Sequence, residues 1–276
     1  MRLVTLLSPT GPVAAVERGT RHFAVRAADG ATFEDVGALL CSGPRWRRLA
    51  EAADDALPEG LPSLRPVLEP GVVACVGMNY RRHIEEMGRE PPTSPTWFSK
   101  PARALADPGA DVRLPAASHA VDYEGELAVV IGSGGRDIPR DRAWDAVAGL
   151  TLLDDVSMRD FQMRTPQWFA GKAWEASTAL GPAVVTIDEL PDLGDREIVT
   201  RVNGEERQRA PLSDLLFDVP ALVEDLSRVF TLRPGDVLAT GTPSGVGHAT
   251  KTYLRAGDVV EVALDGIGVL RTRFVA

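Results

Sequence analysis

The stretch Asp122-Tyr-Glu-Gly-Glu-Leu-Ala-Val-Val-Ile131 joins an acidic start to an uninterrupted apolar run. The run Leu127–Ile131 has the length and β-branched content of a buried strand, and Gly132 bounds it. Side chains alternate faces along a strand, so Glu124 and Glu126 project to one side, about 7 Å apart. Such like charges repel, which is relieved when one carboxyl is protonated or a cation binds. Two glutamates with this spacing more often lie at a solvated strand end, where they bind no cation, and this alternative stays open for the pair taken alone.

Candidate strands lie on both sides of this segment and indicate two unequal parts of the chain. A proline-rich connector at 58–71 separates the parts, and we place the boundary near residue 68. No glycine-rich dinucleotide loop or phosphate loop follows a strand. The predicted fold is α+β and mainly β, with a small N-terminal α+β domain at 1–68 and a catalytic domain at 69–276. The expected strands are Met1–Leu7, Pro12–Glu17, His22–Ala27, Val72–Gly77, Leu127–Ile131, Val237–Thr240, Val259–Leu264 and Val269–Val275, and the expected helices are Asp35–Leu40, Trp46–Ala53, Asn79–Gly88 and 220–230.

The composition favours a globular protein that acts on a small molecule. Of 276 residues, 44% are hydrophobic and 25% charged, and the net charge of −9 argues against a nucleic-acid or anionic-membrane surface. No apolar run approaches the ~20 residues of a spanning helix, and Leu3–Leu7 is too short for a signal-peptide core. Cys41 and Cys75 do not make a disulfide scaffold. We therefore expect a soluble cytoplasmic protein with no nucleic-acid or membrane partner.

A second acidic cluster, Asp154-Asp155 through Asp160, follows the apolar segment Val147–Leu153. Aspartates at such a position serve either as helix caps, the common explanation, or as metal ligands. Three carboxylates that converge from two elements suit Mg²⁺ or Mn²⁺, which prefer oxygen ligands and keep water positions open for a substrate. The cation also offsets most of the charge that these carboxylates bring together.

His83 and Glu86 stand three residues apart, so a helical turn places them on one face. An imidazole oriented by a carboxylate is a general base suited to neutral pH. The alternative is a solvated ion pair on a short helix, which is more frequent for an isolated pair of this kind. None of the four histidines has the H-x-x-x-H spacing, so a histidine-based zinc site is not expected.

Two further features could serve an oxo-acid substrate. Lys172, one of only three lysines in the chain, could stabilise a developing enolate or oxyanion. The loop Thr240–Gly247 is rich in glycine and hydroxyl groups, so its backbone N–H groups could approach a carboxylate closely. A plain turn between strands would explain the same loop without any function.

The order of these motifs resembles the fumarylacetoacetate hydrolase family, in particular its acylpyruvate hydrolase and 2-hydroxyhepta-2,4-diene-1,7-dioate isomerase branch. The resemblance covers about residues 72–275. It rests on N-Y-x-x-H-x-x-E at 79–86, F-S-K-P at 98–101, D-Y-E-G-E-L-A-V-V-I-G at 122–132, D-V-S-x-R-D-x-Q at 155–162, G-K at 171–172, L-G-P at 180–182, V-N-G at 202–204 and T-G-T-P-x-G-V-G at 240–247.

The resemblance implies a mixed β-sandwich roll, a homodimer and a role for each matching residue. The divalent-metal ligands would be Glu124, Glu126 and Asp155, and His83 with Glu86 would form a water-activating dyad on a mobile lid. Lys172 would steady an enolate and Gln162 would face the substrate. The residues expected to bind or lie near the substrate are Thr242, Gly241, Lys100 and Tyr80. Trp174-Glu175-Ala176 and Leu153-Asp154 depart from the family pattern, which leaves the pocket shape and the substrate open.

The function implied is hydrolytic cleavage of a C–C bond in an acylpyruvate-type β-diketo acid. The alternatives use the same enolate for decarboxylation of oxaloacetate, or for tautomerisation or isomerisation of a 2-hydroxydienoate. A non-catalytic protein that binds a metal and an oxo acid is disfavoured, because simple chelation does not need the base that His83 and Glu86 provide.

Overall fold

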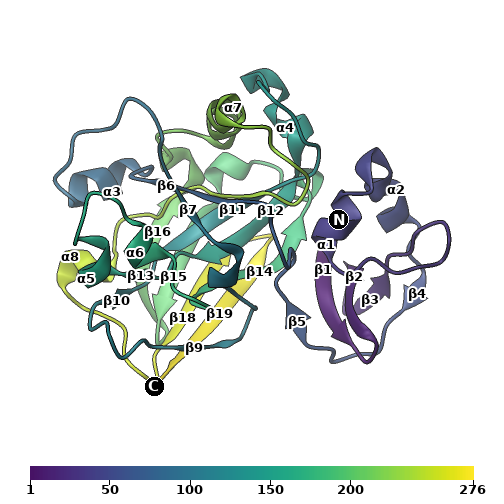
Figure 1. The fold of residues 1–276 in the computed structure, drawn as a ribbon, viewed down its shortest axis with the longest axis horizontal. Coiled ribbons are helices and arrows are strands. Elements are labelled where there is room, and N and C mark those ends of the chain that lie inside the picture. The colour runs from purple at the N-terminus through teal and green to yellow at the C-terminus, as the bar shows by residue number, and fades with distance from the viewer.

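The structure is a computed structural model that describes residues 1–276. Figure 1 shows a small lobe formed by the first strands and two helices, set beside a larger lobe that holds the remaining sheets. No helix combines the length and the apolar character needed to cross a membrane. The expected class, α+β and mainly β with a β-sandwich catalytic part, is confirmed.

One large sheet runs through both lobes. It consists of twelve strands. In order these are β4 (Asp55–Ala56), β3 (Arg21–Ala24), β2 (Gly11–Arg18), β1 (Arg2–Ser8), β14 (Thr178–Val185), β12 (Val147–Asp154), β11 (Gly125–Ile131), β17 (Val237–Ala239), β6 (Val73–Gly77) and β7 (Thr96–Lys100), with β5 (Ser63–Leu64) beside β1 and β8 (Leu105–Ala106) beside β14.

Two smaller sheets complete the β-structure. The five-stranded sheet has the order β16 (Glu205–Pro211), β15 (Glu197–Val202), β18 (Val259–Leu264), β19 (Gly268–Val275) and β9 (Asp111–Arg113), and the two-stranded sheet pairs β10 (Val121–Asp122) with β13 (Ser157–Met158). The helices are short: α1 (Val36–Leu40), α2 (Trp46–Glu51), α3 (Arg81–Glu86), α4 (Ala143–Ala146), α5 (Arg159–Gln162), α6 (Phe169–Lys172), α7 (Val219–Val229) and α8 (Gly247–Thr250). Short 3₁₀ turns lie at 43–45, 102–104, 140–142, 187–189, 193–195 and 212–214.

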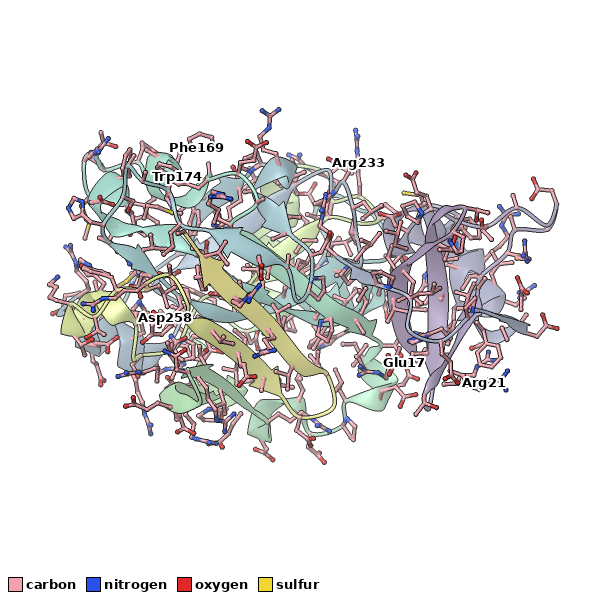
Figure 2. The ribbon with its side chains drawn as sticks, turned by 90° about the horizontal axis from the view of Figure 1, so that it is seen from below. Glu17, Arg21, Phe169, Trp174, Arg233 and Asp258 are labelled. Carbon is pink, nitrogen blue, oxygen red and sulfur yellow. The ribbon has the colours of Figure 1, made fainter.

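The N-terminal lobe is joined to the catalytic lobe by strand pairing. Arg2 and Leu3 of β1 pair with Val185 and Val184 of β14. One hydrophobic cluster also contains residues of both lobes, among them Leu39 of α1 and Cys75 of β6. Figure 2 shows Glu17 and Arg21 on the N-terminal strands at the opposite end of the molecule from Phe169 and Trp174. The division at residue 68 stays a prediction.

The central strands β11 and β12 are buried along their whole length. Along β11 the side chains alternate as the sequence predicted. Leu127, Val129 and Ile131 belong to the hydrophobic cluster that includes the five-stranded sheet, whereas Ala128 and Val130 belong to the cluster shared with the N-terminal lobe. This alternation places the two faces of β11 in different surroundings and leaves the glutamates on the face opposite the five-stranded sheet.

The register between β11 and β12 determines where the acidic residues meet. Gly125 pairs with Asp154 in an antiparallel ladder, and the N–H of Asp155 donates to the carbonyl of Glu124 over 2.8 Å. The start of one strand therefore lies directly beside the end of the other. Because of this register, residues about thirty positions apart in the sequence become neighbours at one edge of the buried strand pair.

Gly125 allows the two sheets to approach closely beneath these residues. A Cβ at this position would lie 2.1 Å from Oγ1 of Thr200 and 3.1 Å from a methyl group of Val262, both on the five-stranded sheet. We predict that Gly125→Ala lowers the free energy of unfolding by about 2 kcal/mol, because the added methyl group overpacks this interface. Urea unfolding of the two proteins measures the difference.

The matched control is Gly194→Ala, where a Cβ would meet no atom within 4 Å. We expect its free energy of unfolding to stay within about 0.5 kcal/mol of the wild type. Equal stability of the Gly125→Ala variant and the wild type would contradict the packing described here.

Candidate active site

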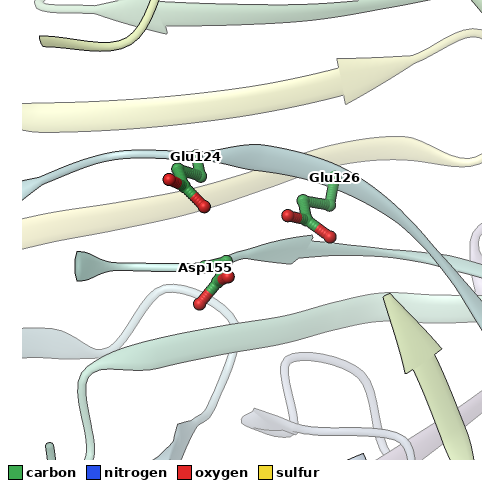
Figure 3. A group of neighbouring side chains, drawn as sticks. All are labelled: Glu124, Glu126 and Asp155. Atoms are coloured by element: carbon green, nitrogen blue, oxygen red, sulfur yellow. The ribbon is translucent and has the colours of Figure 1, made fainter. Parts of the chain in front are cut away.

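Three carboxylates from the two central strands converge at one point. Glu124 precedes β11, Glu126 lies in it, and Asp155 follows β12. One oxygen of each lies within 4.8 Å of the others, and the side chains turn toward one another (Figure 3). All three residues are buried. The structure thus brings together the residues that the sequence proposed as metal ligands.

Lysine ammonium groups lie on two sides of this cluster. Nζ of Lys172, at the end of α6, lies 2.6 Å from Oε2 of Glu124 and 2.7 Å from Oδ2 of Asp155. Nζ of Lys100 lies 2.7 Å from the other oxygen of Asp155 and also donates to the carbonyl of Val156. Asp155 is therefore held between two cations.

Arg159 forms a third cationic partner and connects the cluster to its surroundings. Its guanidinium lies 2.8 Å from Asp122 and 2.6 Å from Oε1 of Glu124, and it donates to the side-chain oxygen of Gln162 over 2.9 Å. Asp122 in turn accepts the backbone N–H groups of Gly247 and His248. This network fixes Glu124, and it orients Gln162 at the cavity.

The two glutamates have opposite electrostatic surroundings. Burial would raise the pKa of Glu124, but the charges of Lys172 and Arg159 hold that pKa well below its ordinary range. Glu126 has no cationic partner, and its carboxylate accepts a hydrogen bond only from the N–H of Gly241, over 2.8 Å. Burial and the neighbouring charge of Asp155 therefore raise the pKa of Glu126 well above its ordinary value.

The cluster as a whole carries more buried acid than buried base. Five carboxyl groups face three cations, which leaves two negative charges without compensation. Burial also raises the pKa of Asp154 to about 7, so protons at Asp154 and Glu126 relieve this excess. A dication brings the same two positive charges, and carboxylate oxygens are the ligands that Mg²⁺ and Mn²⁺ prefer. The five acidic residues are Asp122, Glu124, Glu126, Asp154 and Asp155, and the three cations are Lys100, Arg159 and Lys172. The residues present fit a divalent metal ion.

His83 and Glu86 form a separate pair on α3. Nδ1 of His83 lies 3.0 Å from Oε2 of Glu86, and the other oxygen of Glu86 accepts the N–H of Gly245 over 2.9 Å. Because a carboxylate only accepts, this contact places the proton of a neutral imidazole on Nδ1 and leaves the lone pair on Nε2. The buried side chain of Asn79 holds the start of α3, since it bonds to the backbone of Phe217 and Thr240.

Glu124 and Glu126 of the carboxylate cluster and His83 line one cavity of about 360 Å³, whereas Asp155 does not line it. Glu124, Glu126, Arg159, Gln162, Lys172 and Thr242 supply polar groups to it. The rings of Phe98 and Trp168 form an edge-to-face wall with centroids 5.5 Å apart, and Nζ of Lys172 lies 5.0 Å from the Phe98 centroid. A Cβ at Gly77 would lie 2.3 Å from the Trp168 ring, so only glycine leaves room for this wall.

The residues proposed to bind substrate occupy different places. Thr242 lines the cavity, donates to the carbonyl of Gly125 and accepts from Gln208. Gly241 lies behind Glu126, as the hydrogen bond from its N–H shows. Lys100 and Tyr80 are buried and do not line the cavity. Gly241 and Lys100 each contact one of the three carboxylates, Glu126 and Asp155 respectively.

Sequence reasoning missed several residues that line the cavity, among them Arg89, Arg159, Trp168 and His248. Arg159 stood in the quoted motif at 155–162, where its spacing from Asp155 could have identified it. Trp168 lies in a polar, irregular segment that gives no periodic signal. His248 follows the glycine-rich loop, and its ring contacts the hydroxyl of Tyr253 at 3.2 Å.

The raised pKa of Glu126 predicts a pH dependence of stability in the absence of metal. Below its raised pKa the folded chain holds a proton that the unfolded chain has already lost, so the free energy of unfolding falls as pH rises. We expect Glu126→Gln to remove this contribution, which amounts to at most about 1.4 kcal/mol per pH unit as the pH rises above about 5. Urea unfolding of the wild type and of Glu126→Gln at several pH values in EDTA measures the decline in the free energy of unfolding.

Addition of Mn²⁺ extends this experiment. It should stabilise the wild type but not Glu126→Gln, because the variant lacks one ligand. Glu59→Gln, on an exposed glutamate of the N-terminal lobe, is the control and should behave as the wild type. An identical pH dependence in the wild type and Glu126→Gln would refute this account of the buried charge.

The comparisons with known proteins agree with this geometry. The family described as "Fumarylacetoacetate (FAA) hydrolase C-terminal" matches residues 72–275. The chain therefore belongs to the fumarylacetoacetate hydrolase family of enzymes, which confirms the resemblance read from the motifs.

Relatives and solved structures indicate where in the family the chain lies. It is 36% identical over 290 residues to "Oxaloacetate tautomerase fahd2, mitochondrial" of Xenopus laevis, covering 98% of this chain and 89% of the relative. It is 40% identical over 211 residues to "Oxaloacetate tautomerase YisK" of Bacillus subtilis, covering 74% and 70%. The structure of 5-carboxymethyl-2-hydroxymuconate delta-isomerase from Mycobacterium smegmatis superposes with a TM-score of 0.81 at 36% identity, covering 100% and 98%.

Proposed function

We propose that this protein is a divalent-metal-dependent enzyme that moves a proton between oxygen and carbon of a small 2-oxo acid, as a tautomerase or isomerase. The observation that carries the proposal is that His83, which is paired with Glu86, lines the same cavity as Glu124 and Glu126 of the buried carboxylate cluster. The names of the relatives in Xenopus laevis and Bacillus subtilis support it. The proposal includes Mg²⁺ or Mn²⁺ as the metal and a homodimer as the assembly.

The metal would be held by Glu124, Glu126 and Asp155. When bound, it supplies a Lewis acid that polarises a carbonyl oxygen and offsets the charge of an enolate. Lys172 and Arg159 add positive charge beside Glu124, which favours the anionic oxo-acid group at the inner end of the cavity. Gln162 and Thr242 provide polar atoms on the same wall.

His83 carries out the proton transfer. Its Nε2 lone pair accepts the proton of the enol hydroxyl, and the same nitrogen returns a proton to the adjacent carbon, which gives the ketone. Glu86 stabilises the imidazolium between these two events, because it accepts the Nδ1 hydrogen bond and is itself fixed by Gly245. The Phe98–Trp168 wall limits the access of water to the enolate.

Hydrolysis of a C–C bond in an acylpyruvate is the second candidate. The cavity of about 360 Å³ has room for a water molecule beside a small acid. His83 could then take a proton from that water rather than from the substrate. The motif order by itself favours this reaction, and decarboxylation of oxaloacetate stays open beside it.

We predict that His83→Gln lowers the rate of oxaloacetate tautomerisation at least about 100-fold, because general acid–base catalysis is lost. Binding of Mn²⁺ should remain, since the variant keeps all three carboxylates. Loss of the enol absorbance measures the rate, and calorimetry measures the metal. His22→Gln, on β3 of the N-terminal lobe, is the matched control and should retain full activity.

Product analysis separates the candidate reactions. The metal-loaded enzyme is given oxaloacetate, acetylpyruvate and a 2-hydroxydienoate, and the products are identified by chromatography. Ketonisation without bond cleavage supports the tautomerase, acetate and pyruvate support the hydrolase, and pyruvate from oxaloacetate supports the decarboxylase. Undiminished tautomerisation by His83→Gln would exclude the proton-transfer role given to this histidine.

A further inference from the structure

The exposed part of the active-site cavity includes a guanidinium group that has no ion-pair partner in the chain. Arg89 lines the cavity and is exposed. Its guanidinium makes no ion pair or hydrogen bond within the chain. The other two cations of the lining are both engaged: Lys172 with Glu124 and Asp155, and Arg159 with Asp122 and Glu124.

The backbone holds Arg89 at this mouth. Gly88 has φ +62°, which lets the chain reverse after α3, and the N–H of Arg89 donates to the carbonyl of Ile84 over 3.1 Å. Arg89 is thereby attached to the same helical turn that carries His83. A substrate group bound by Arg89 would be placed relative to the base that acts on the substrate.

The cavity lining combines buried polar groups, apolar side chains and the exposed guanidinium of Arg89. Glu126 is 1% exposed, whereas Arg89 is exposed. The apolar side chains of the lining include Val76, Met78, Met87, Phe98 and Trp168. This combination suits an oxo acid with an apolar segment and a second acidic group.

We propose that Arg89 is a specificity-determining residue that binds a second, distal carboxylate of the substrate and so selects 2-oxo diacids over 2-oxo monoacids. The inference rests on the proposed function, since the oxo-acid head lies at the carboxylate cluster. Arginine suits this role, because its planar donors match a carboxylate. Glu90 also lines the mouth and opposes the charge of Arg89. Removal of the Glu90 charge should therefore strengthen the binding of a distal carboxylate.

The test compares two acids of equal length that differ only in the distal carboxylate, 2-oxoheptanedioate and 2-oxoheptanoate. Their affinities for the Mg²⁺-loaded full chain are measured by calorimetry. In the wild type we expect the diacid to bind about tenfold more tightly. Arg89→Gln should abolish this advantage, Arg89→Lys should keep part of it, and Glu90→Gln should increase it.

Arg82→Gln is the control, because Arg82 is an exposed arginine of α3 that does not line the cavity. It should leave both affinities unchanged. Equal binding of the two acids by the wild type, binding of neither, or an undiminished advantage in Arg89→Gln overturns the proposal.

Turnover is measured separately, so that the two proposals fail in different ways. If the wild type isomerises none of the oxo acids but binds the diacid more tightly through Arg89, the proposed reaction is wrong and the role of Arg89 holds. If the wild type is active and Arg89→Gln lowers kcat for diacid and monoacid alike, Arg89 is not a specificity residue.

Discussion

The antiparallel register of β11 and β12 governs how the catalytic lobe is organised. It places Glu124, Glu126 and Asp155 at one buried point, where uncompensated carboxylates would be strongly unfavourable. Buried cations from other segments compensate part of this negative charge. The pKa values of Glu126 and Asp154 are also raised, so that protonation removes more of it. Buried ion pairs of this kind contribute little net stability, because desolvation offsets the attraction between the charges. Their arrangement is better explained by what it does for a bound dication and an anionic substrate.

The cations that compensate this charge connect the site to the whole catalytic lobe. Lys100 comes from β7 at the edge of the large sheet, Arg159 from α5, and Lys172 from α6. Each bonds to at least one carboxylate or backbone group that leads back to the central strands. The carboxylate cluster and Gln162 are therefore parts of one charge network and not separate features.

The His83–Glu86 pair is held in place independently of that network. His83 and Glu86 lie on a short helix whose beginning is fixed by Asn79 and whose glutamate is fixed by Gly245. A general base near an enolate serves tautomerisation, isomerisation or hydrolysis, depending on where the substrate presents its proton and whether water is admitted. This explains how one family can contain enzymes named for different reactions. In our proposal, the lining of the cavity, with Arg89 at its mouth, determines which acid is accepted.

Local sequence patterns were enough to predict most of the long strands, the helix α7 and the residues able to carry chemistry. Periodicity and turn residues are properties of short segments, and they drew attention to Glu124, Glu126, Asp155, His83 and Glu86. Only the order of the motifs along the chain, through the family resemblance, gave these residues their expected roles. The positions of Lys100 and Gly241 behind the carboxylates, the recruitment of Arg159, and the unpaired guanidinium of Arg89 emerged from the tertiary structure. These depend on sheet register and on packing between segments far apart in the chain, which no local pattern encodes.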